Sequence, residues 1–143
     1  MKDDLTTEES ITIDAPMGTV WEALTTPETI KRWFFGVDTD TDWRVGSPIV
    51  HRGEYQGKPY EDKGEILEIL PPRRLIHSHW SPVSGLPDSP ENYQRVTWEL
   101  SETAEGGTEL TIKEVNLPSE EARATSEKSW RMVLENLKAL LEE

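Results

Sequence analysis

Two histidines two residues apart give this sequence its clearest candidates for proton chemistry. His77 and His79 belong to an alternating run at 75–80 that is typical of a β-strand, so both imidazoles lie on the same strand face. Inside a cavity they could hydrogen-bond a ligand oxygen or act as acid and base near neutral pH. The opposite orientation fits the pattern as well: Ile76 and Trp80 would face the core and both histidines would lie in water.

The same histidines are candidates for a metal site, together with His51 and a carboxylate such as Glu54 or Glu68. Strand positions i and i+2 can share a metal ion, but a lone His-x-His is a weak pattern and no helical His-Glu-x-x-His accompanies it. We therefore expect no metal and no cofactor. Motifs of nucleotide-binding loops and serine nucleophiles are also missing, so the catalytic residues stay undefined and Glu68 is a lone candidate acid.

Three alternating aspartates, Asp38, Asp40 and Asp42, have the spacing that opens a calcium-binding EF-hand loop. The rest of such a loop does not fit this sequence. Trp43 occupies the sixth position, where a glycine is needed, and Ile49 occupies the twelfth, where a glutamate chelates the ion. The segment is therefore predicted to be an acidic, solvated turn.

Aromatic and aliphatic side chains at regular spacing predict an apolar wall. An apolar cavity with a few polar groups is the usual form of a small-molecule site, whereas the alternative is a core that these side chains fill completely. Together with the two histidines, the predicted ligand-binding residues are Trp33, Phe34, His77, His79, Trp98, Trp130, Val133 and Leu137.

Hydrophobic periodicity and turn residues predict the elements that carry these side chains. A first strand at 10–14 precedes two short helices that begin near Pro16 and Pro27. Glycines and prolines then separate runs with one apolar and one polar face, which is typical of an antiparallel sheet. These later strands are predicted at 42–45, 49–55, 61–70, 75–80, 94–101 and 108–115.

The C-terminal segment has the strongest helical pattern. Its start signal lies at Pro118 and Ser119, and its apolar residues recur at helical spacing from Trp130 to Leu141. Such a helix needs an apolar partner, and the inner face of the sheet is the only large one. We therefore predict an α+β fold in which the helices lie on one side of a curved antiparallel sheet of six or seven strands.

The composition excludes several classes of function. The 143 residues include 15 Lys and Arg against 28 Asp and Glu, a formal net charge of −13, so nucleic-acid and anionic-membrane binding are disfavoured. Cysteine is absent, which excludes disulfides and thiolate chemistry, and no apolar run is long enough for a membrane span. We expect a cytoplasmic protein with a flexible N-terminus at 1–8 and a single domain at 9–143.

Two segments, IDAPMGTVWEALTTPE at 13–28 and SWRMVLENL at 129–137, resemble the activator of heat-shock protein 90 ATPase homologue family. That family belongs to the START-like, Bet-v-1-like superfamily, whose members share the helix-grip fold. The resemblance implies that the long last helix lies across the curved sheet, with an elongated apolar cavity between them in many members. It also implies that His77 and His79 face inward.

The superfamily includes lipid carriers, cyclases, hydrolases and cochaperone domains, so the fold leaves the activity open. Our leading expectation is a protein that binds an apolar, aromatic or lipid-like small molecule beneath its last helix. One alternative is an interaction protein that docks on a chaperone in the way of the ATPase activators. The other is a cyclase-like or hydrolase-like enzyme that uses His77, His79 or Glu68. The resemblance also allows a homodimer.

Overall fold

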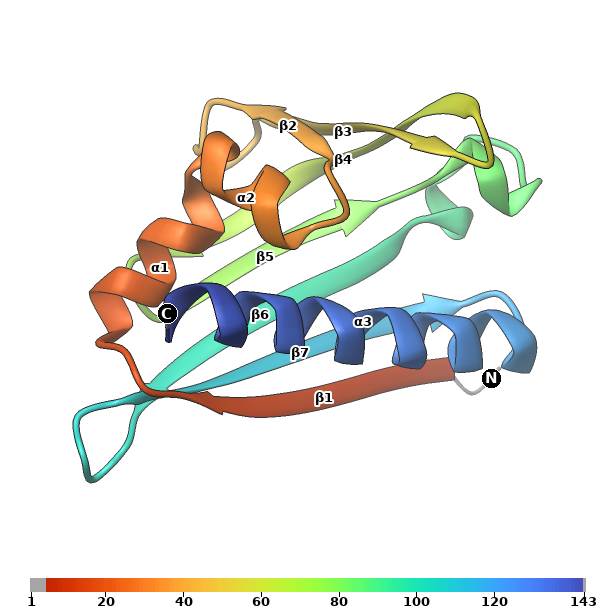
Figure 1. The fold of residues 1–143 in the computed structure, drawn as a ribbon. Coiled ribbons are helices and arrows are strands. Elements are labelled where there is room, and N and C mark those ends of the chain that lie inside the picture. Colours follow the sequence, from red (N-terminus) through yellow and green to blue (C-terminus); the bar gives the residue numbers. More distant parts are fainter. Residues whose placement is uncertain (1–4, 143) are drawn as a thin grey trace.

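An antiparallel sheet of seven strands forms the framework of the protein, whose computed structural model describes residues 5–142 (Figure 1). The strand order is β1-β7-β6-β5-β4-β3-β2, and every neighbouring pair is antiparallel. The strands are β1 (Leu5–Ile13), β2 (Asp38–Thr41), β3 (Pro48–Tyr55), β4 (Lys58–Leu70), β5 (Arg74–His79), β6 (Gln94–Glu102) and β7 (Thr108–Leu117).

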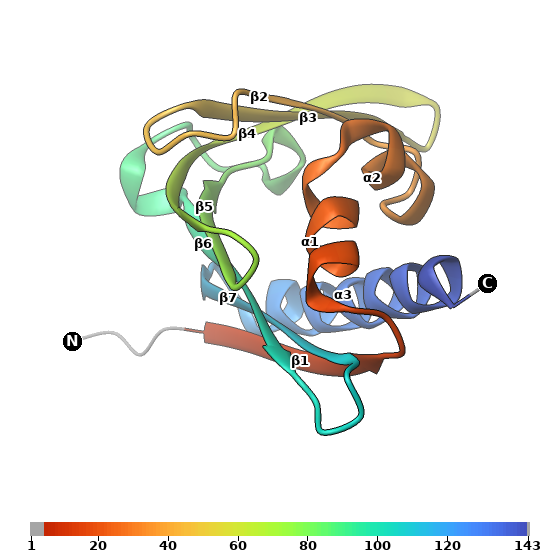
Figure 2. The same ribbon diagram turned by 90° about the vertical axis from the view of Figure 1, so that its left-hand side faces the viewer.

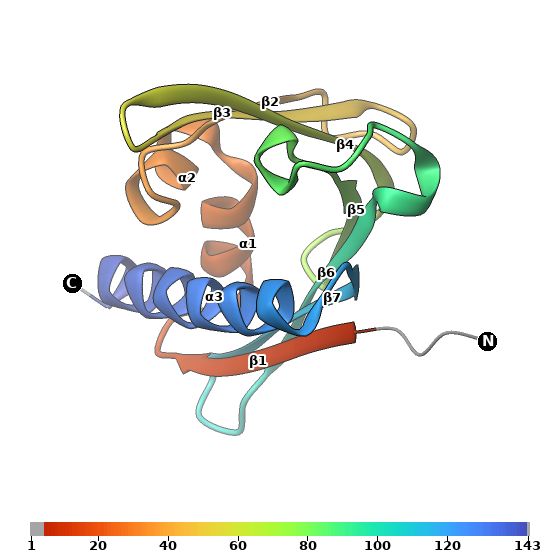
Figure 3. The same ribbon diagram turned by 90° about the vertical axis from the view of Figure 1, so that its right-hand side faces the viewer.

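Three α-helices lie on the concave side of this sheet: α1 (Met17–Thr25), α2 (Pro27–Trp33) and α3 (Glu120–Leu141). Figures 2 and 3 show the sheet curving around them, with α3 beside β1 and with α2 near β2 at the other edge. Two short 3-10 helices, η1 (Pro82–Ser84) and η2 (Pro90–Asn92), belong to the loop between β5 and β6. The predicted α+β helix-grip fold is confirmed.

The hydrophobic core lies between the sheet and the helices. Ile13 from β1, Val20 from α1, Ile112 from β7 and Leu137 from α3 are all fully buried and belong to one cluster. Burying an aliphatic side chain of this size contributes roughly 1.5–3 kcal/mol relative to leaving it in water. This shared core fixes α3 against the β1 and β7 side of the sheet.

Local sequence explains where the helices begin and end. Pro27 is the first residue of α2, where its missing amide hydrogen costs nothing. Ser119 caps α3, because its hydroxyl accepts a hydrogen bond of 3.1 Å from the amide of Ala122. Helix α2 ends at Trp33 because the following Phe35 and Gly36 adopt φ angles of 51° and 73°, which turn the chain toward β2.

The strand predicted at 42–45 is wrong, because β2 lies four residues earlier. The aspartates that were predicted to form a solvated turn therefore belong in part to an edge strand: Asp38 and Asp40 face solvent, whereas Thr39 between them is buried. An edge strand tolerates this polar sequence because only one of its faces packs on the core. Trp43 cannot continue the strand, since its φ is 58°.

Strand β1 begins earlier than expected. Residues 5–8, which were expected to be flexible, pair with β7, and Leu5 lies opposite Leu117. Thr7 is only 3% exposed, so burial against the sheet holds this segment in place. Residues 1–4 of the expected flexible segment lie outside the described residues. Within 5–142, no helix combines the length and the apolar character that crossing a bilayer requires.

Candidate functional site

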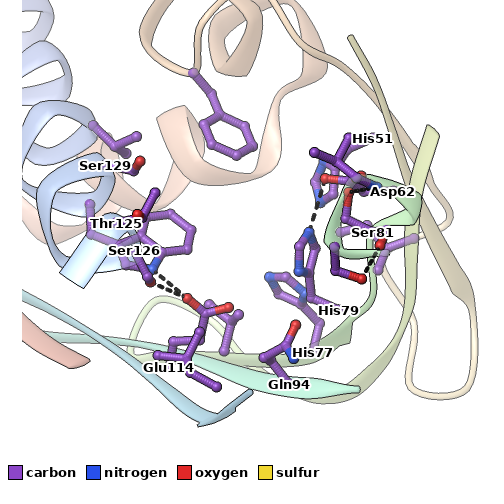
Figure 4. Close-up of a pocket in the computed structure, with 18 of the residues that line it drawn as sticks. His51, Asp62, His77, His79, Ser81, Gln94, Glu114, Thr125, Ser126 and Ser129 are labelled. Atoms are coloured by element: carbon purple, nitrogen blue, oxygen red, sulfur yellow. Dashed lines mark hydrogen bonds and ion pairs between the residues drawn. The ribbon is translucent and has the colours of Figure 1, made fainter. Parts of the chain in front are cut away.

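A cavity of about 750 Å³ lies between the sheet, α2 and the N-terminal half of α3 (Figure 4). Its deeper wall is apolar, with side chains such as Ile30, Leu75 and Val96. Exposed residues of the loop after β5 and of the start of α3, among them Val83 and Ser119, lie at its rim. The cavity therefore lies beneath the last helix, as the resemblance implied.

Seven of the eight predicted ligand-binding residues line this cavity: Trp33, Phe34, His77, His79, Trp98, Trp130 and Val133. Leu137 does not, because it is fully buried in the core one helical turn beyond Val133. Glu68, the lone candidate acid, lies outside the lining and pairs with Arg74 at 3.7 Å.

Four aromatic side chains form a connected cluster along one wall. Trp98 meets Trp33 and Trp130 edge to face, with ring centroids 5.8 and 5.6 Å apart. Phe34 lies nearly parallel to Trp130 at 6.1 Å. Such pairs contribute beyond their buried area, so the cluster gives the cavity a stiff aromatic wall. The space beside it remains open, which differs from the alternative of a completely filled core.

His77 points into the cavity and presents a hydrogen-bond acceptor there. Its Nδ1 lies 2.9 Å from the carbonyl oxygen of Ser78, which can only accept, so Nδ1 carries the proton. Burial lowers the pKa of His77 to about 4, and therefore the ring is neutral at pH 7. In that neutral ring Nε2 has a free lone pair. His77 can accept a hydrogen bond from a ligand but holds no charge for it.

His79, two residues along the same strand face, has its pKa shifted in the opposite direction. Burial works to lower the pKa of His79, but the hydrogen bond and charge of Asp62 raise it above its ordinary value, with smaller contributions from Glu114 and Gln94. The Nε2–Oδ2 distance to Asp62 is 3.1 Å. Nδ1 of His79 and Oδ1 of Asp62 are buried without hydrogen-bond partners. The pair resembles the carboxylate-oriented imidazoles of acid–base sites.

A third histidine, His51 on β3, completes the polar side of the cavity. Its Nδ1 lies 3.1 Å from the hydroxyl of Thr39, and its ring centre lies 6.0 Å from that of His77 and 6.5 Å from that of His79. Burial, followed by the charges of His77 and His79, holds the pKa of His51 well below its ordinary value. Of the three rings, His79 is therefore the one whose surroundings favour the protonated form.

Glu114 on β7 brings a buried carboxylate to the other side of the cavity. The residue is 5% exposed, and its Oε1 accepts hydrogen bonds from the hydroxyl of Ser126 and, at 2.9 Å, from the indole Nε1 of Trp130. Both donors come from α3. Among residues 5–142 the second oxygen, Oε2, has no hydrogen-bond partner. Figure 4 shows Glu114 across the cavity from His77 and His79.

Sequence reasoning missed Asp62, Gln94 and Glu114, although strand alternation carried a signal for two of them. Glu114 has the parity of the buried Ile112, and Asp62 has the parity of Ile66. A charged side chain on a core-facing position is unusual, which makes such a position a candidate for a functional site. Within the described residues, no group of three His, Asp or Glu side chains has an arrangement that would hold a metal ion.

Comparison with known proteins places the chain among solved structures of the same fold. ChR145 from Cytophaga hutchinsonii is 43% identical, with 99% of this chain and 97% of that chain covered and a TM-score of 0.84. CalU16 from Micromonospora echinospora is 30% identical, with 96% and 75% covered and a TM-score of 0.71. A protein described as the Aha1 dimer from Colwellia psychrerythraea is 23% identical, with 96% of each chain covered and a TM-score of 0.75.

The comparison with curated proteins gives no match. The profile of one family, described as activator of Hsp90 ATPase homolog 1-like protein, matches residues 14–142. That range contains the second segment on which the resemblance was based, all of the first except Ile13, and every residue of the cavity wall. The chain therefore belongs to the activator of Hsp90 ATPase homolog 1-like family.

Proposed function

We propose that the protein binds an apolar or aromatic small molecule in the cavity beneath α3. The observation that carries the proposal is the open space itself: about 750 Å³, walled mainly by apolar and aromatic side chains. Small-molecule sites have volumes of about 300–1,000 Å³ and combine such walls with a few polar groups. His77, His79 and Glu114 are polar groups of this kind, since each reaches the cavity from a rigid strand.

The proposal competes with two other roles that the superfamily suggests. A chaperone-docking role draws on the family description alone, and an enzymatic role draws on the Asp62–His79 pair. The open cavity supports ligand binding more directly than it supports either. A homodimer also stays a prediction for this chain, since the relative described as a dimer is 23% identical and shows the fold alone.

A binding experiment with the neutral fluorescent dye Nile red tests the proposal, followed by a thermal-stability screen of lipids, polyketides, flavonoids and steroids. We expect the dye to bind one site per chain and hits from the screen to displace it. A ligand that binds only the folded protein adds about 2.7 kcal/mol to the free energy of unfolding at 100 times its dissociation constant. A thermal melt detects a change of this size as a rise in the unfolding temperature.

Two tryptophan variants on α3 locate the binding. Ser129 lines the cavity, whereas Ala124 lies exposed on the outer side of the same helix. Ser129→Trp fills part of the space and should abolish dye binding, and Ala124→Trp should leave it unchanged. The proposal fails if wild-type protein binds neither the dye nor any compound of the screen, or if both variants bind like wild type.

A further inference from the structure

The charged groups of the cavity are mainly anionic. Three carboxylates line it, from Asp62, Glu114 and Glu121, together with the imidazole of His79, whose pKa the contact with Asp62 raises. Among the described residues of the lining, none is lysine or arginine. An anionic ligand would therefore meet no lysine or arginine in the lining, and the one imidazole with a raised pKa, His79, already pairs with Asp62.

Within this set, Glu114 is the buried carboxylate that has no cation hydrogen-bonded to it among the described residues. Asp62 and His79 neutralise each other through their direct hydrogen bond. Glu114 receives only the neutral donors of Ser126 and Trp130, both on Oε1. A buried carboxylate without a cation is costly, and a positive group placed against it recovers much of that cost. Oε2 is the free position for such a group.

We infer that the cavity selects a ligand that carries a protonated amine on an aromatic or apolar body; this inference rests on the proposed function. The ammonium group would lie against Oε2 of Glu114. The aromatic body suits the wall of Trp33, Phe34 and Trp98. Aromatic ring faces also attract cations, which favours an amine over a neutral group in the same place. The net charge of −13 draws cations toward the protein from solution.

The inference excludes ligands whose polar end is a carboxylate, free fatty acids included. Across the cavity, Nε2 of His77 accepts a hydrogen bond, so a hydroxyl group at the far end of the ligand would also find a partner. His77 and Glu114 therefore both favour hydrogen-bond donors on the ligand, and only Glu114 favours a positive charge.

Three pyrenes with the same fluorescent ring system and different charges form the test: 1-pyrenemethylamine, 1-pyrenemethanol and 1-pyreneacetate. Each is titrated against the full chain at pH 7 in 150 mM salt, where binding to exposed charges is largely screened. We expect the amine to bind most tightly, the alcohol less tightly and the acetate least. Glu114→Gln keeps the shape and the acceptor for Trp130, and it should weaken amine binding roughly thirtyfold or more while leaving the alcohol unchanged.

Glu109→Gln is the matched control, because Glu109 lies on the outward face of the same strand and the substitution removes the same charge. It should leave the preference for the amine intact.

Equal binding of the three pyrenes, tightest binding of the acetate, or an unchanged preference in Glu114→Gln overturns the inference. If Nile red binds wild type but no pyrene does, the inference is overturned while the proposed function stands; if Nile red also fails, the proposed function falls. Should Glu114→Gln not fold, the wild-type order of the three pyrenes still decides.

Discussion

At the scale of single residues, two histidines on one strand face have pKa values shifted in opposite directions because their partners differ. His77 donates to the backbone carbonyl of the next residue, Ser78, and is otherwise surrounded by the core, so burial decides its state. His79 lies against the carboxylate of Asp62, and that contact outweighs burial. The cavity therefore contains one fixed acceptor and one fixed ion pair within a short stretch of β5.

The ion pair makes a prediction about the titration of His79. Removing the Asp62 charge by Asp62→Asn leaves burial as the main influence, and the pKa of His79 should fall from above its ordinary value to below it. Two-dimensional NMR of the histidine ring signals, followed from pH 5 to pH 9, measures this directly. The ring signals of His77 should stay those of a neutral imidazole over the same range.

Glu61→Gln is the appropriate control for that titration. Glu61 directly precedes Asp62 in β4, points away from the cavity and pairs with Arg52 at 2.9 Å. Its substitution removes one negative charge as Asp62→Asn does, but it should leave the pKa of His79 raised. A raised pKa that persists in Asp62→Asn would show that another group holds the proton on His79.

Strand alternation was sufficient to predict that His77 and His79 share a face, and the resemblance predicted which face. Their charge states could not be predicted in this way. They depend on Asp62, 17 residues earlier on a neighbouring strand, and on the depth of burial beneath α3. Glu114 was missed, although its parity with Ile112 carried a signal, and only the packed structure shows that Ser126 and Trp130 of α3 hold its carboxylate.

At the scale of elements, the close approach of β4 to β5 brings Asp62 and His79 together. Gly64 lies where these strands meet, and a Cβ atom added to it would come within 1.8 Å of the carbonyl oxygen of Ser78. The same carbonyl accepts the Nδ1 proton of His77, so the strand contact and the tautomer of His77 depend on one atom. No side chain fits there without moving the two strands apart.

Gly64→Ala should therefore lower the free energy of unfolding by more than about 3 kcal/mol, because the backbone has to shift to relieve the clash. Urea denaturation followed by tryptophan fluorescence provides the measurement. Gly18→Ala is the matched control: Gly18 lies in α1 with nothing within 4 Å of an added Cβ, and alanine there should stabilise the helix by up to about 1 kcal/mol. Equal stability of the two variants would contradict the role given to Gly64.

The order of the elements followed from periodicity, because each strand and helix has one apolar face with the expected spacing. The edge strand β2 did not, since its residues are polar and only Thr39 is buried. Its position depends on pairing with β3, where Thr39 lies opposite His51. Periodicity finds elements that bury a whole face, and it misses a short edge strand that is held by its neighbour.

At the scale of the whole molecule, a strongly acidic exterior encloses a cluster of three histidines. Two of them, His51 and His77, are buried in the neutral form, and their pKa values lie below the ordinary histidine value of 6.5. A group whose pKa is lower in the folded protein binds fewer protons there than in the unfolded chain. Acid therefore favours the unfolded chain, in addition to what it does to the surface carboxylates.

For His77 the size of this effect follows from a folded pKa of about 4 and an unfolded value of 6.5. Between pH 7.5 and pH 5, His77 becomes protonated in the unfolded chain but stays largely neutral in the folded protein. The free energy of unfolding should therefore fall by about 2 kcal/mol from His77 alone. His51 acts in the same direction. His79 acts oppositely, because its raised pKa stabilises the fold at low pH and this contribution is lost as the pH rises through that value.

His77→Asn isolates the contribution, because asparagine can keep a donor near the Ser78 carbonyl but does not titrate. Wild type and variant are denatured with urea at pH 7.5 and at pH 5, and the change between the two pH values is compared rather than the stability itself. The wild type should lose about 2 kcal/mol more than the variant over this interval. Parallel losses would mean that His77 takes up a proton without unfolding, so that the cavity, rather than the fold, accommodates a second positive charge beside His79.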